Sequence, residues 1–336
     1  MSAIRRSRTA GVANLVAKHG CAAVHVASET GEGERTRFRE ARLTSVIVGV
    51  TGASGRLGRL VIDALLDRGV PVESVVPISR TRVDDRTRFG DFERPQTLNE
   101  ALQGVDRLLV ISALGTGDMV GAHRAAFEAA ARTGVRRIVF TSMQNPVRDN
   151  PFPPAAIYLH SEADLTAVGV PSTILRNALY ADRRADLARC YARDGRWTTN
   201  LGDGGHAFVT RADCAAAAAA ALCDDGHEGR RYDVTGPVLV TADDYVALVR
   251  ERTGADIERD DVDDDAYERH RAAFTVDPAN AGTFELFTGT GRAIREGHLC
   301  VLGDGVHALT GHEPRPLQTL WPAGRSASAA PAPPTE

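Results

Sequence analysis

The chain has 336 residues, of which 43% are hydrophobic and 25% are charged, a balance that is ordinary for a globular protein. Its formal net charge of −4 gives no electrostatic reason to expect a nucleic acid or a membrane surface as a partner. No apolar run approaches the roughly 20 residues that a membrane-spanning helix requires. We therefore expect a cytoplasmic protein that binds neither nucleic acid nor membrane.

The cysteine and lysine content excludes further chemistry. The five cysteines are scattered and include no Cys-x-x-Cys pair, which favours reduced thiols over a disulfide framework or a zinc site. No metal site is therefore expected. Lys18 is the only lysine, so no later lysine is available to form a Schiff base or to lower the pKa of a tyrosine.

The two ends of the chain differ from the rest in composition. Residues 1–43 show no sustained helical or strand period and are predicted to form a poorly ordered extension. A secretory or twin-arginine signal is the less favoured alternative, because Lys18 and His19 interrupt the apolar stretch 11–17. Residues 323–336 are rich in Ala, Pro and Ser and are predicted to form a flexible tail.

Regular structure is predicted to begin at Thr44, where short β-branched runs alternate with stretches of helical spacing. We predict strands over 45–50, 72–79, 105–112, 135–141 and 172–175, and helices over 56–68, 96–103, 121–133 and 155–168. Such alternation implies parallel strands joined by helical crossovers. Residues 44–180 are therefore predicted to form an α/β core with a doubly wound parallel sheet, the Rossmann fold.

Beyond residue 180 the alternation weakens, and we predict a smaller C-terminal substrate-binding part over 181–322, packed on the core. Helices are expected over 181–193, 211–223 and 243–253, the second starting with a capping box from Thr210 to Asp213. The acidic run 260–265 lacks the glycine turn of a calcium loop, so a solvated surface is the favoured interpretation.

A glycine-rich segment lies between the first predicted strand and the first predicted helix. Glycines at such a turn let the backbone approach a pyrophosphate, and the helix N-terminus offers free N–H groups to it. The position at the start of a βαβ series favours a dinucleotide site over a ligand-free turn. The segment reads Thr51-Gly52-Ala53-Ser54-Gly55-Arg56-Leu57-Gly58.

The end of the second predicted strand bears on the choice of cofactor. NAD sites usually place an acid there, whereas an arginine accommodates the 2′-phosphate of NADP. Arg80 stands at this point, with Arg56 or Arg82 as possible helpers, and no acid follows until Asp84. We therefore expect NADP(H), with NAD(H) the less favoured alternative and a chance surface arginine the alternative reading of Arg80.

Several segments resemble the NmrA-like branch of the atypical short-chain dehydrogenase/reductases. They are TGASGRLG at 51–58, Gly90-Asp91-Phe92, and the stretches 108–112, 134–142, 202–204, 210–213, 294–297 and 309–311. The stretch 169–180 is more particularly similar to the NADPH-dependent quinone oxidoreductases of that branch. The resemblance covers roughly residues 45–322.

The resemblance implies a set of cofactor and substrate contacts. Arg80 would hold the 2′-phosphate, and Asp91 and Phe92 would border the adenine. The pyrophosphate would lie on Thr51, Gly52, Ala53, Ser54, Gly55, Arg56 and Leu57. The ribose and nicotinamide would be lined by Ser112, Ala113, Leu114, Thr141, Ser142 and Met143. Substrate contacts are assigned to Ser142 and, because they lie just past a predicted strand end, to Asn177 and Tyr180, for which structural turn residues are the alternative reading.

The catalytic assignment departs from the family pattern, because the only lysine, Lys18, precedes the predicted core and cannot form a Tyr-x-x-x-Lys pair there. Aligning the helix predicted over 155–168 with the family places Tyr158 where a basic residue is common. Tyr158 would donate a hydrogen bond to a carbonyl, and His160 would supply a proton. The alternatives are a packing tyrosine and a solvent-facing histidine.

We expect an oxidoreductase that transfers hydride from NADPH to a small molecule, a quinone or similar conjugated carbonyl. The alternatives are a non-catalytic regulator that senses NADP(H) and a tailoring ketoreductase of a biosynthetic pathway. The protein is expected to be a monomer or a homodimer.

Overall fold

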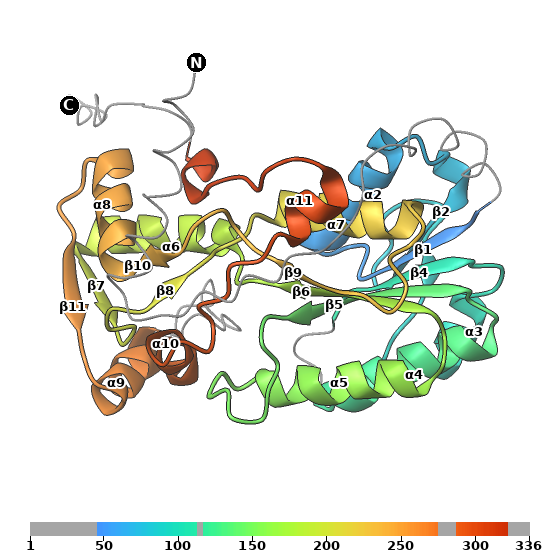
Figure 1. Ribbon diagram of the computed structural model, residues 1–336, viewed down its shortest axis with the longest axis horizontal. Helices are drawn as coiled ribbons and strands as arrows, with labels where there is room; N and C mark the ends of the chain where they lie inside the picture. Colours follow the sequence, from blue (N-terminus) through green and yellow to red (C-terminus); the bar gives the residue numbers. More distant parts are fainter. Residues whose placement is uncertain (1–45, 113–116, 275–286, 322–336) are drawn as a thin grey trace, which may run out of the picture.

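The computed structural model describes residues 46–112, 117–274 and 287–321, and its centre is a seven-stranded sheet (Figure 1). The strand order is β3-β2-β1-β4-β5-β6-β9, and all neighbouring pairs are parallel. The strands are β1 (Val48–Thr51), β2 (Val75–Ser79), β3 (Arg88–Phe89), β4 (Arg107–Val110), β5 (Arg137–Met143), β6 (Ser172–Asn177) and β9 (Arg231–Val234). The predicted doubly wound Rossmann fold is confirmed.

Helices cover both faces of this sheet, which explains why its central strands are buried and apolar. One face carries α2 (Arg56–Asp67), α7 (Arg211–Cys223) and α11 (Gly305–Thr310) (Figure 1). The other carries α3 (Gln96–Ala101), α4 (Met119–Arg132) and α5 (Ala155–Ala167). A buried hydrophobic cluster lies on each side, and the one beneath α4 and α5 continues into the C-terminal elements.

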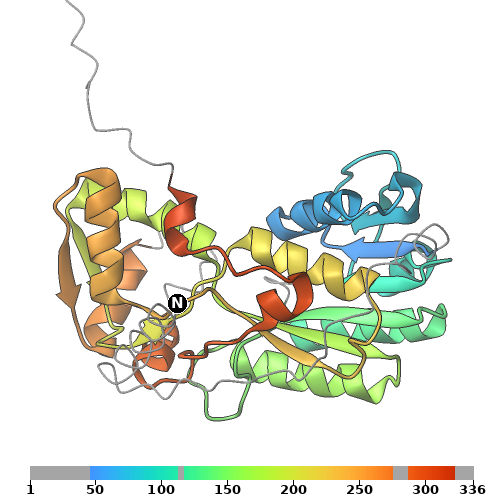
Figure 2. The ribbon, with the colours of Figure 1, turned by 45° about the horizontal axis from the view of Figure 1, so that its top comes forward.

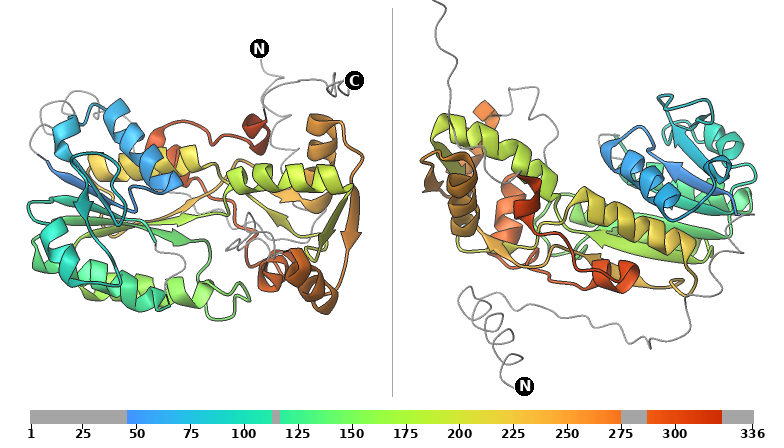
Figure 3. Two further views of the ribbon diagram at one scale, coloured as in Figure 1. Left: turned by 180° about the vertical axis from the view of Figure 1, so that it is seen from behind. Right: turned by 90° about the horizontal axis from the view of Figure 1, so that it is seen from above.

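The remaining elements lie beyond the carboxyl ends of β5 and β6, as Figures 2 and 3 show. Helix α6 (Ala181–Asp194) leads from β6 into this C-terminal group. Its strands form two small pairs, β7 (Arg196–Thr199) with β11 (Glu258–Asp261), and β8 (Gly205–His206) with β10 (Val240–Thr241). Its helices are α8 (Ala242–Thr253), α9 (Asp264–Phe274) and α10 (Thr288–Arg295), and short 3₁₀ turns occur at Val72–Ser74 and Leu317–Leu320.

A buried arginine holds part of this C-terminal group together. The guanidinium carbon of Arg184 lies 5.0–5.2 Å from the ring centres of Trp197, Phe208 and Tyr245. The Tyr245 hydroxyl donates to the backbone carbonyl of Arg184 at 2.7 Å. Aromatic faces attract a cation, so this arrangement ties α6, β7 and α8 to one another.

Helix α7 shows how the local sequence fixes an element against the sheet. Its alanine run is buried, and the small side chains permit close packing beside α2 (Figure 1). The Thr210 hydroxyl accepts the Asp213 N–H at 3.0 Å, as an N-cap does. The Asp213 carboxylate, however, binds the Thr210 hydroxyl and Arg315 instead of completing the predicted capping box.

Some sequence predictions concern residues outside the described ranges. These are the extension 1–43, the tail 323–336, and the cofactor contacts Ala113 and Leu114. No helix in the described ranges is both long and apolar enough to cross a membrane.

Candidate active site

The loop between β1 and α2 has the backbone that a glycine-rich phosphate site requires. Gly52 has φ 63°, in the left-handed region that favours glycine. A methyl group on Gly58 would come within 2.3 Å of the Gly52 carbonyl oxygen, so only glycine lets α2 pack this closely on the loop. Gly55 caps α2 without a side-chain hydrogen bond. The first N–H groups of α2 are therefore available to a phosphate.

The neighbouring end of β2 leaves one arginine free. Arg80 is exposed and has no ion-pair partner within the described ranges, whereas Arg56 pairs with Asp186 at 3.0 Å and Arg82 pairs with Asp85. The Ser79 hydroxyl donates to the Ser54 hydroxyl at 2.7 Å and ties the end of β2 to the glycine loop. Arg80 therefore lies beside the loop with its guanidinium uncommitted.

Asp91 supports the turn that follows β3, next to a half-buried Phe92. Burial raises the pKa of Asp91, but the hydrogen bonds from Arg94 and the Glu93 N–H, and the charges of Arg94 and Arg80, outweigh burial and hold the pKa below its usual value. The carboxylate is thus ionised and occupied by the turn itself. The structure places this turn near Arg80, on the β2–β3 side of the glycine loop.

Hydroxyl groups connect the carboxyl ends of β4 and β5 to α5. The Tyr158 hydroxyl donates to Ser112 Oγ at 2.9 Å. Thr141 Oγ1 accepts the Ser112 N–H at 2.9 Å and donates to Ser112 Oγ at 3.4 Å. Burial raises the pKa of Tyr158, and the hydrogen bond to Ser112 opposes this only in part, so the phenol is protonated at neutral pH. The structure thus brings three residues of the predicted site together.

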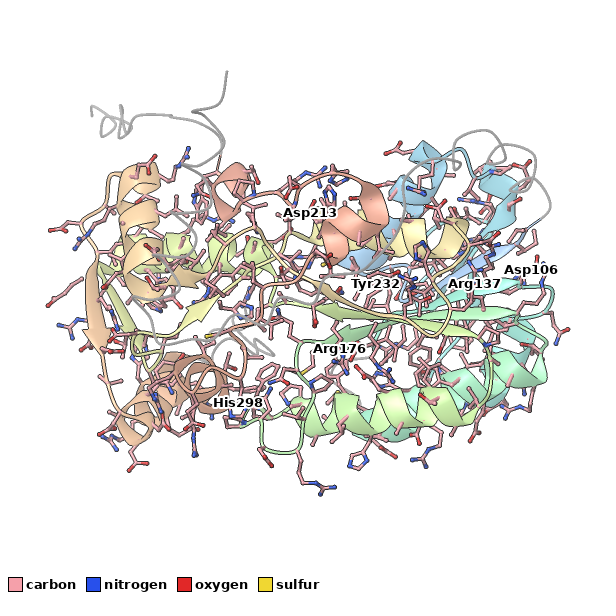
Figure 4. All side chains as sticks on the ribbon, viewed as in Figure 1. Asp106, Arg137, Arg176, Asp213, Tyr232 and His298 are labelled. Atoms are coloured by element: carbon pink, nitrogen blue, oxygen red, sulfur yellow. The ribbon has the colours of Figure 1, made fainter. Side chains whose placement is uncertain are left out.

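Ser142, the residue after Thr141 in β5, forms a hydrogen bond with a different residue of α5. Its hydroxyl donates to Glu162 Oε1 at 2.7 Å, and Arg176 donates to both carboxylate oxygens of Glu162, at 2.9 and 2.7 Å. Figure 4 shows Arg176 between the sheet and α5. Tyr158 and Glu162 both lie on the buried face of α5, but they bind different partners. Glu162 therefore fixes the helix that carries Tyr158.

His160 does not join these residues, because its side chain is exposed on the outer face of α5. A different histidine, His123 of α4, packs against Tyr158 with 6.1 Å between the ring centres. His123 Nδ1 lies 2.8 Å from the Ser161 hydroxyl, and burial lowers the histidine pKa to about 4. His123 is therefore neutral. Nothing in the sequence indicated this contact, because His123 lies on a different helix, α4, and no sequence spacing pairs it with Tyr158.

Asn177 and Tyr180 lie at the end of β6. Asn177 is only 7% exposed, yet neither polar atom of its side chain has a hydrogen-bond partner in the described ranges. Burial raises the pKa of Tyr180, as do the nearby Cys214 and Tyr158 groups, against the opposing influence of Asn177 and Arg211. The Asn177 amide thus lies close to the Tyr180 phenol and lowers its pKa. Tyr158 and Tyr180 belong to one neighbourhood.

Two polar residues near this point were missed by sequence reasoning. Gln144 follows β5, is 1% exposed, and donates to the Val301 carbonyl at 3.1 Å, which leaves its Oε1 without a partner in the described ranges. The Arg211 guanidinium lies 4.4 Å from the centre of the Tyr180 ring. Gln144 could have been predicted as a site residue, because it directly follows a strand end. Arg211 could not, because it lies on a later helix.

These features fit a bound dinucleotide: a left-handed glycine turn, an open helix N-terminus, an arginine at the end of β2 without an ion-pair partner in the described ranges, and buried amide atoms without a partner there at the ends of β5 and β6. No cluster of three or more potential metal ligands occurs in the parts of the chain that the structure describes. The fold and the loop together define a dinucleotide-binding α/β protein.

Comparison with known proteins identifies the family. The model of the NAD(P)H-binding family matches residues 52–225, so the chain belongs to that family. The predicted NmrA-like relationship is confirmed, and the protein is an NAD(P)H-dependent oxidoreductase.

The chain is similar to Quinone oxidoreductase 2 of Escherichia coli, with 32% identity over 219 residues that cover 63% of this chain and 76% of the relative. It is also similar to the (4-alkanoyl-5-oxo-2,5-dihydrofuran-3-yl)methyl phosphate reductase of Streptomyces griseus, with 30% identity over 84% of this chain and 99% of the relative. Among solved structures, an NADPH-dependent quinone oxidoreductase of Escherichia coli complexed with NADPH superposes with a TM-score of 0.74. It is 28% identical over 81% of this chain and 98% of its own.

Proposed function

We propose that the protein is an NADPH-dependent reductase that transfers hydride to a quinone or a similar conjugated carbonyl. The observation that carries this proposal is the buried Tyr158 hydroxyl, held by Ser112 at the carboxyl ends of the strands beside the glycine loop. When bound, the cofactor supplies the hydride. The names of the two relatives, one a quinone and one an oxo-dihydrofuran reductase, support a conjugated acceptor.

Tyr158 provides the polar group that a developing oxyanion needs. The phenol is neutral because burial raises its pKa, so it donates a hydrogen bond without a lysine to activate it. A hydroxyl has one donor and two lone pairs. When Tyr158 turns its O–H to the acceptor oxygen, the Ser112 O–H becomes free to donate to the Tyr158 oxygen. Thr141 continues to donate to Ser112, and the three hydroxyls then point in one direction and strengthen one another.

The preference for NADP(H) rests on Arg80. Of the three arginines that the sequence offers at this place, Arg56 and Arg82 have carboxylate partners and Arg80 has none in the described ranges. A guanidinium binds a phosphate through two parallel N–H groups. We assign Arg80 to the 2′-phosphate.

The test is NADPH oxidation measured against a panel of quinones and unsaturated lactones, with NADPH binding measured in parallel on the same protein. Turnover of a quinone or lactone with saturation at low concentration supports the proposal. Tight NADPH binding without turnover of any acceptor favours the cofactor-sensing regulator instead. Turnover restricted to saturated ketones favours the tailoring ketoreductase.

A further inference from the structure

A largely buried arginine beside Tyr180 makes no side-chain hydrogen bond to the residues that the structure describes. Arg211, the first residue of α7, exposes 14% of its side chain, and its Nη1 is buried without a hydrogen bond to the described residues. The nearest carboxylate oxygen, Asp182 Oδ1, is 3.8 Å from Nη1. Burying a charge is costly unless hydrogen bonds compensate it. The guanidinium is therefore balanced by a loose ion pair with Asp182, while its buried Nη1 has no hydrogen bond within the described ranges.

Asp182 gives the guanidinium only an ion pair at 3.8 Å, because its other carboxylate oxygen is held by a backbone N–H. Asp182 Oδ2 accepts the backbone N–H of Arg211 at 2.8 Å, and this contact joins the N-termini of α6 and α7. The joint depends on the backbone of residue 211 and not on its side chain. The guanidinium itself lies flat on the Tyr180 ring, 4.4 Å from its centre. The structural joint would therefore persist without the guanidinium.

Two further donors lie beside Arg211. Asn177 carries an amide whose nitrogen and oxygen are both buried without a partner in the described ranges. The Arg211 guanidinium lies over the Tyr180 ring, and both it and the Asn177 amide lower the pKa of the Tyr180 phenol, so the three side chains lie close together. A guanidinium, an amide NH₂ and a neutral hydroxyl are the donors that proteins use for carboxylates, sulfonates and phosphates.

We propose that Asn177, Tyr180 and Arg211 form a subsite for an anionic group on the acceptor, so that the preferred substrates are conjugated carbonyl compounds carrying a carboxylate, sulfonate or phosphate. This inference rests on the proposed function. Tyr158 lies near this subsite, because its ionisation would raise the pKa of Tyr180. An acceptor whose anionic group binds in the subsite would therefore have the rest of its molecule close to the proposed oxyanion donor.

The second source of such an anion is the cofactor, because α7 packs beside α2 and its glycine loop (Figure 1). The experiment distinguishes an anionic group of the acceptor from a phosphate of the cofactor. Anthraquinone-2-sulfonate and the neutral anthraquinone-2-sulfonamide are titrated calorimetrically into the full-length protein saturated with NADP⁺, and NADPH affinity is measured by fluorescence. The variant is Arg211→Met, and the matched control is Arg189→Met, which removes a largely exposed arginine of α6.

We expect the wild-type protein to prefer the sulfonate. Arg211→Met should weaken sulfonate binding at least tenfold and change sulfonamide and NADPH binding less than twofold, while Arg189→Met changes none of the three. Asn177→Asp, which adds a repelling charge at nearly constant size, should give the same selective loss if Arg211→Met does not fold. Equal loss of both probes, no loss, or a loss confined to NADPH would overturn the subsite. Sulfonate preference without quinone turnover would reject quinone reduction and leave the subsite intact.

Discussion

In the proposed reaction, Tyr158 acts without the lysine that short-chain reductases commonly place four residues later. Glu162 occupies that position, and its carboxylate is held by Ser142 and Arg176. A phenol whose pKa is raised by burial is a poor base but a good hydrogen-bond donor. Reducing a quinone requires a donor to the developing oxyanion, and the quinol can take its proton from water afterwards.

The first prediction concerns this hydroxyl. Tyr158→Phe removes the donor and keeps the ring that packs on His123 and Phe140. Turnover of the best quinone should fall by roughly ten- to a thousandfold, with NADPH affinity nearly unchanged. Ser112→Ala removes only the group that orients the phenol and should cost less. Wild-type turnover in Tyr158→Phe would make Tyr158 a packing residue.

Arg80 gives the second prediction, on cofactor choice. Arg80→Ala should weaken NADPH binding by ~1.5–3 kcal/mol, the range of a hydrogen bond to a charged group, and leave NADH binding nearly unchanged. Arg82→Ala is the matched control, because Arg82 is exposed and already paired with Asp85. Dissociation constants for both cofactors decide the question. Equal losses for NADPH and NADH would remove the basis for choosing NADP(H).

At the scale of elements, the sequence predicted the helices and strands that have a strong local pattern and missed those that have a weak one. Helices α2 and α7 occur within one residue of their predicted bounds, because apolar spacing and a capping threonine mark them. Strand β9 was missed, because Arg231 and Asp233 alternate with Tyr232 and Val234 in a short edge strand. Two-residue strands such as β3 form through pairing with a neighbour and have no sequence period.

The residues of the candidate site likewise divide into those that the sequence could predict and those that it could not. Residues at strand ends, such as Ser112, Thr141 and Asn177, were predictable because parallel strands bring their carboxyl ends to one edge. Arg211 and His123 were not, because each comes to the site through the packing of a helix from a distant part of the sequence. Whether His160 faces the site or the solvent depends on how α5 is rotated about its axis, and a weakly amphipathic sequence specifies this rotation poorly.

Two buried histidines predict how these packed elements respond to acid. Burial lowers the pKa of His123 to about 4, and burial together with the charge of Arg184 lowers that of His206 to about 4 despite the Leu299 carbonyl. Because the unfolded value is about 6.5, the unfolded chain binds protons first as pH falls. The stabilising contribution is therefore complete above pH 6.5 and is lost between pH 6.5 and 4.

Urea unfolding at pH 7.5 and 5.0 checks this third prediction. Each histidine should account for about 2 kcal/mol of the stability lost between these two pH values. His123→Leu keeps an apolar side chain among Phe127 and Phe140 and removes one titrating group. The variant should therefore lose about 2 kcal/mol less than the wild-type protein over the same interval. An identical loss in both proteins would show that His123 is not the group that titrates.

At the scale of the whole molecule, the site lies where the sheet core meets the C-terminal group, and a few contacts set their alignment. The loop after β5 makes two of them: Gln144 Nε2 donates to the Val301 carbonyl at 3.1 Å, and Asn145 Nδ2 donates to the His298 carbonyl at 2.9 Å. Figure 4 shows His298 on the C-terminal side of this junction. Tyr158 and the glycine loop belong to the core, whereas Tyr180 leads into the C-terminal group. If Tyr180 contacts the acceptor as proposed, acceptor binding should depend on the junction more than cofactor binding does.

Asn145 tests this alignment, because it combines the contact to His298 with a left-handed backbone at φ 45°. Asn145→Gly removes the side-chain hydrogen bond and tolerates the left-handed backbone, whereas Asn145→Ala also adds backbone strain of about 1 kcal/mol. Both should raise the acceptor KM several-fold and leave the NADPH dissociation constant within twofold. Asn145→Ala should in addition melt at a lower temperature than Asn145→Gly. If NADPH binding weakens as much as acceptor binding, the junction supports the cofactor site as well, and the division of labour between the two parts is wrong.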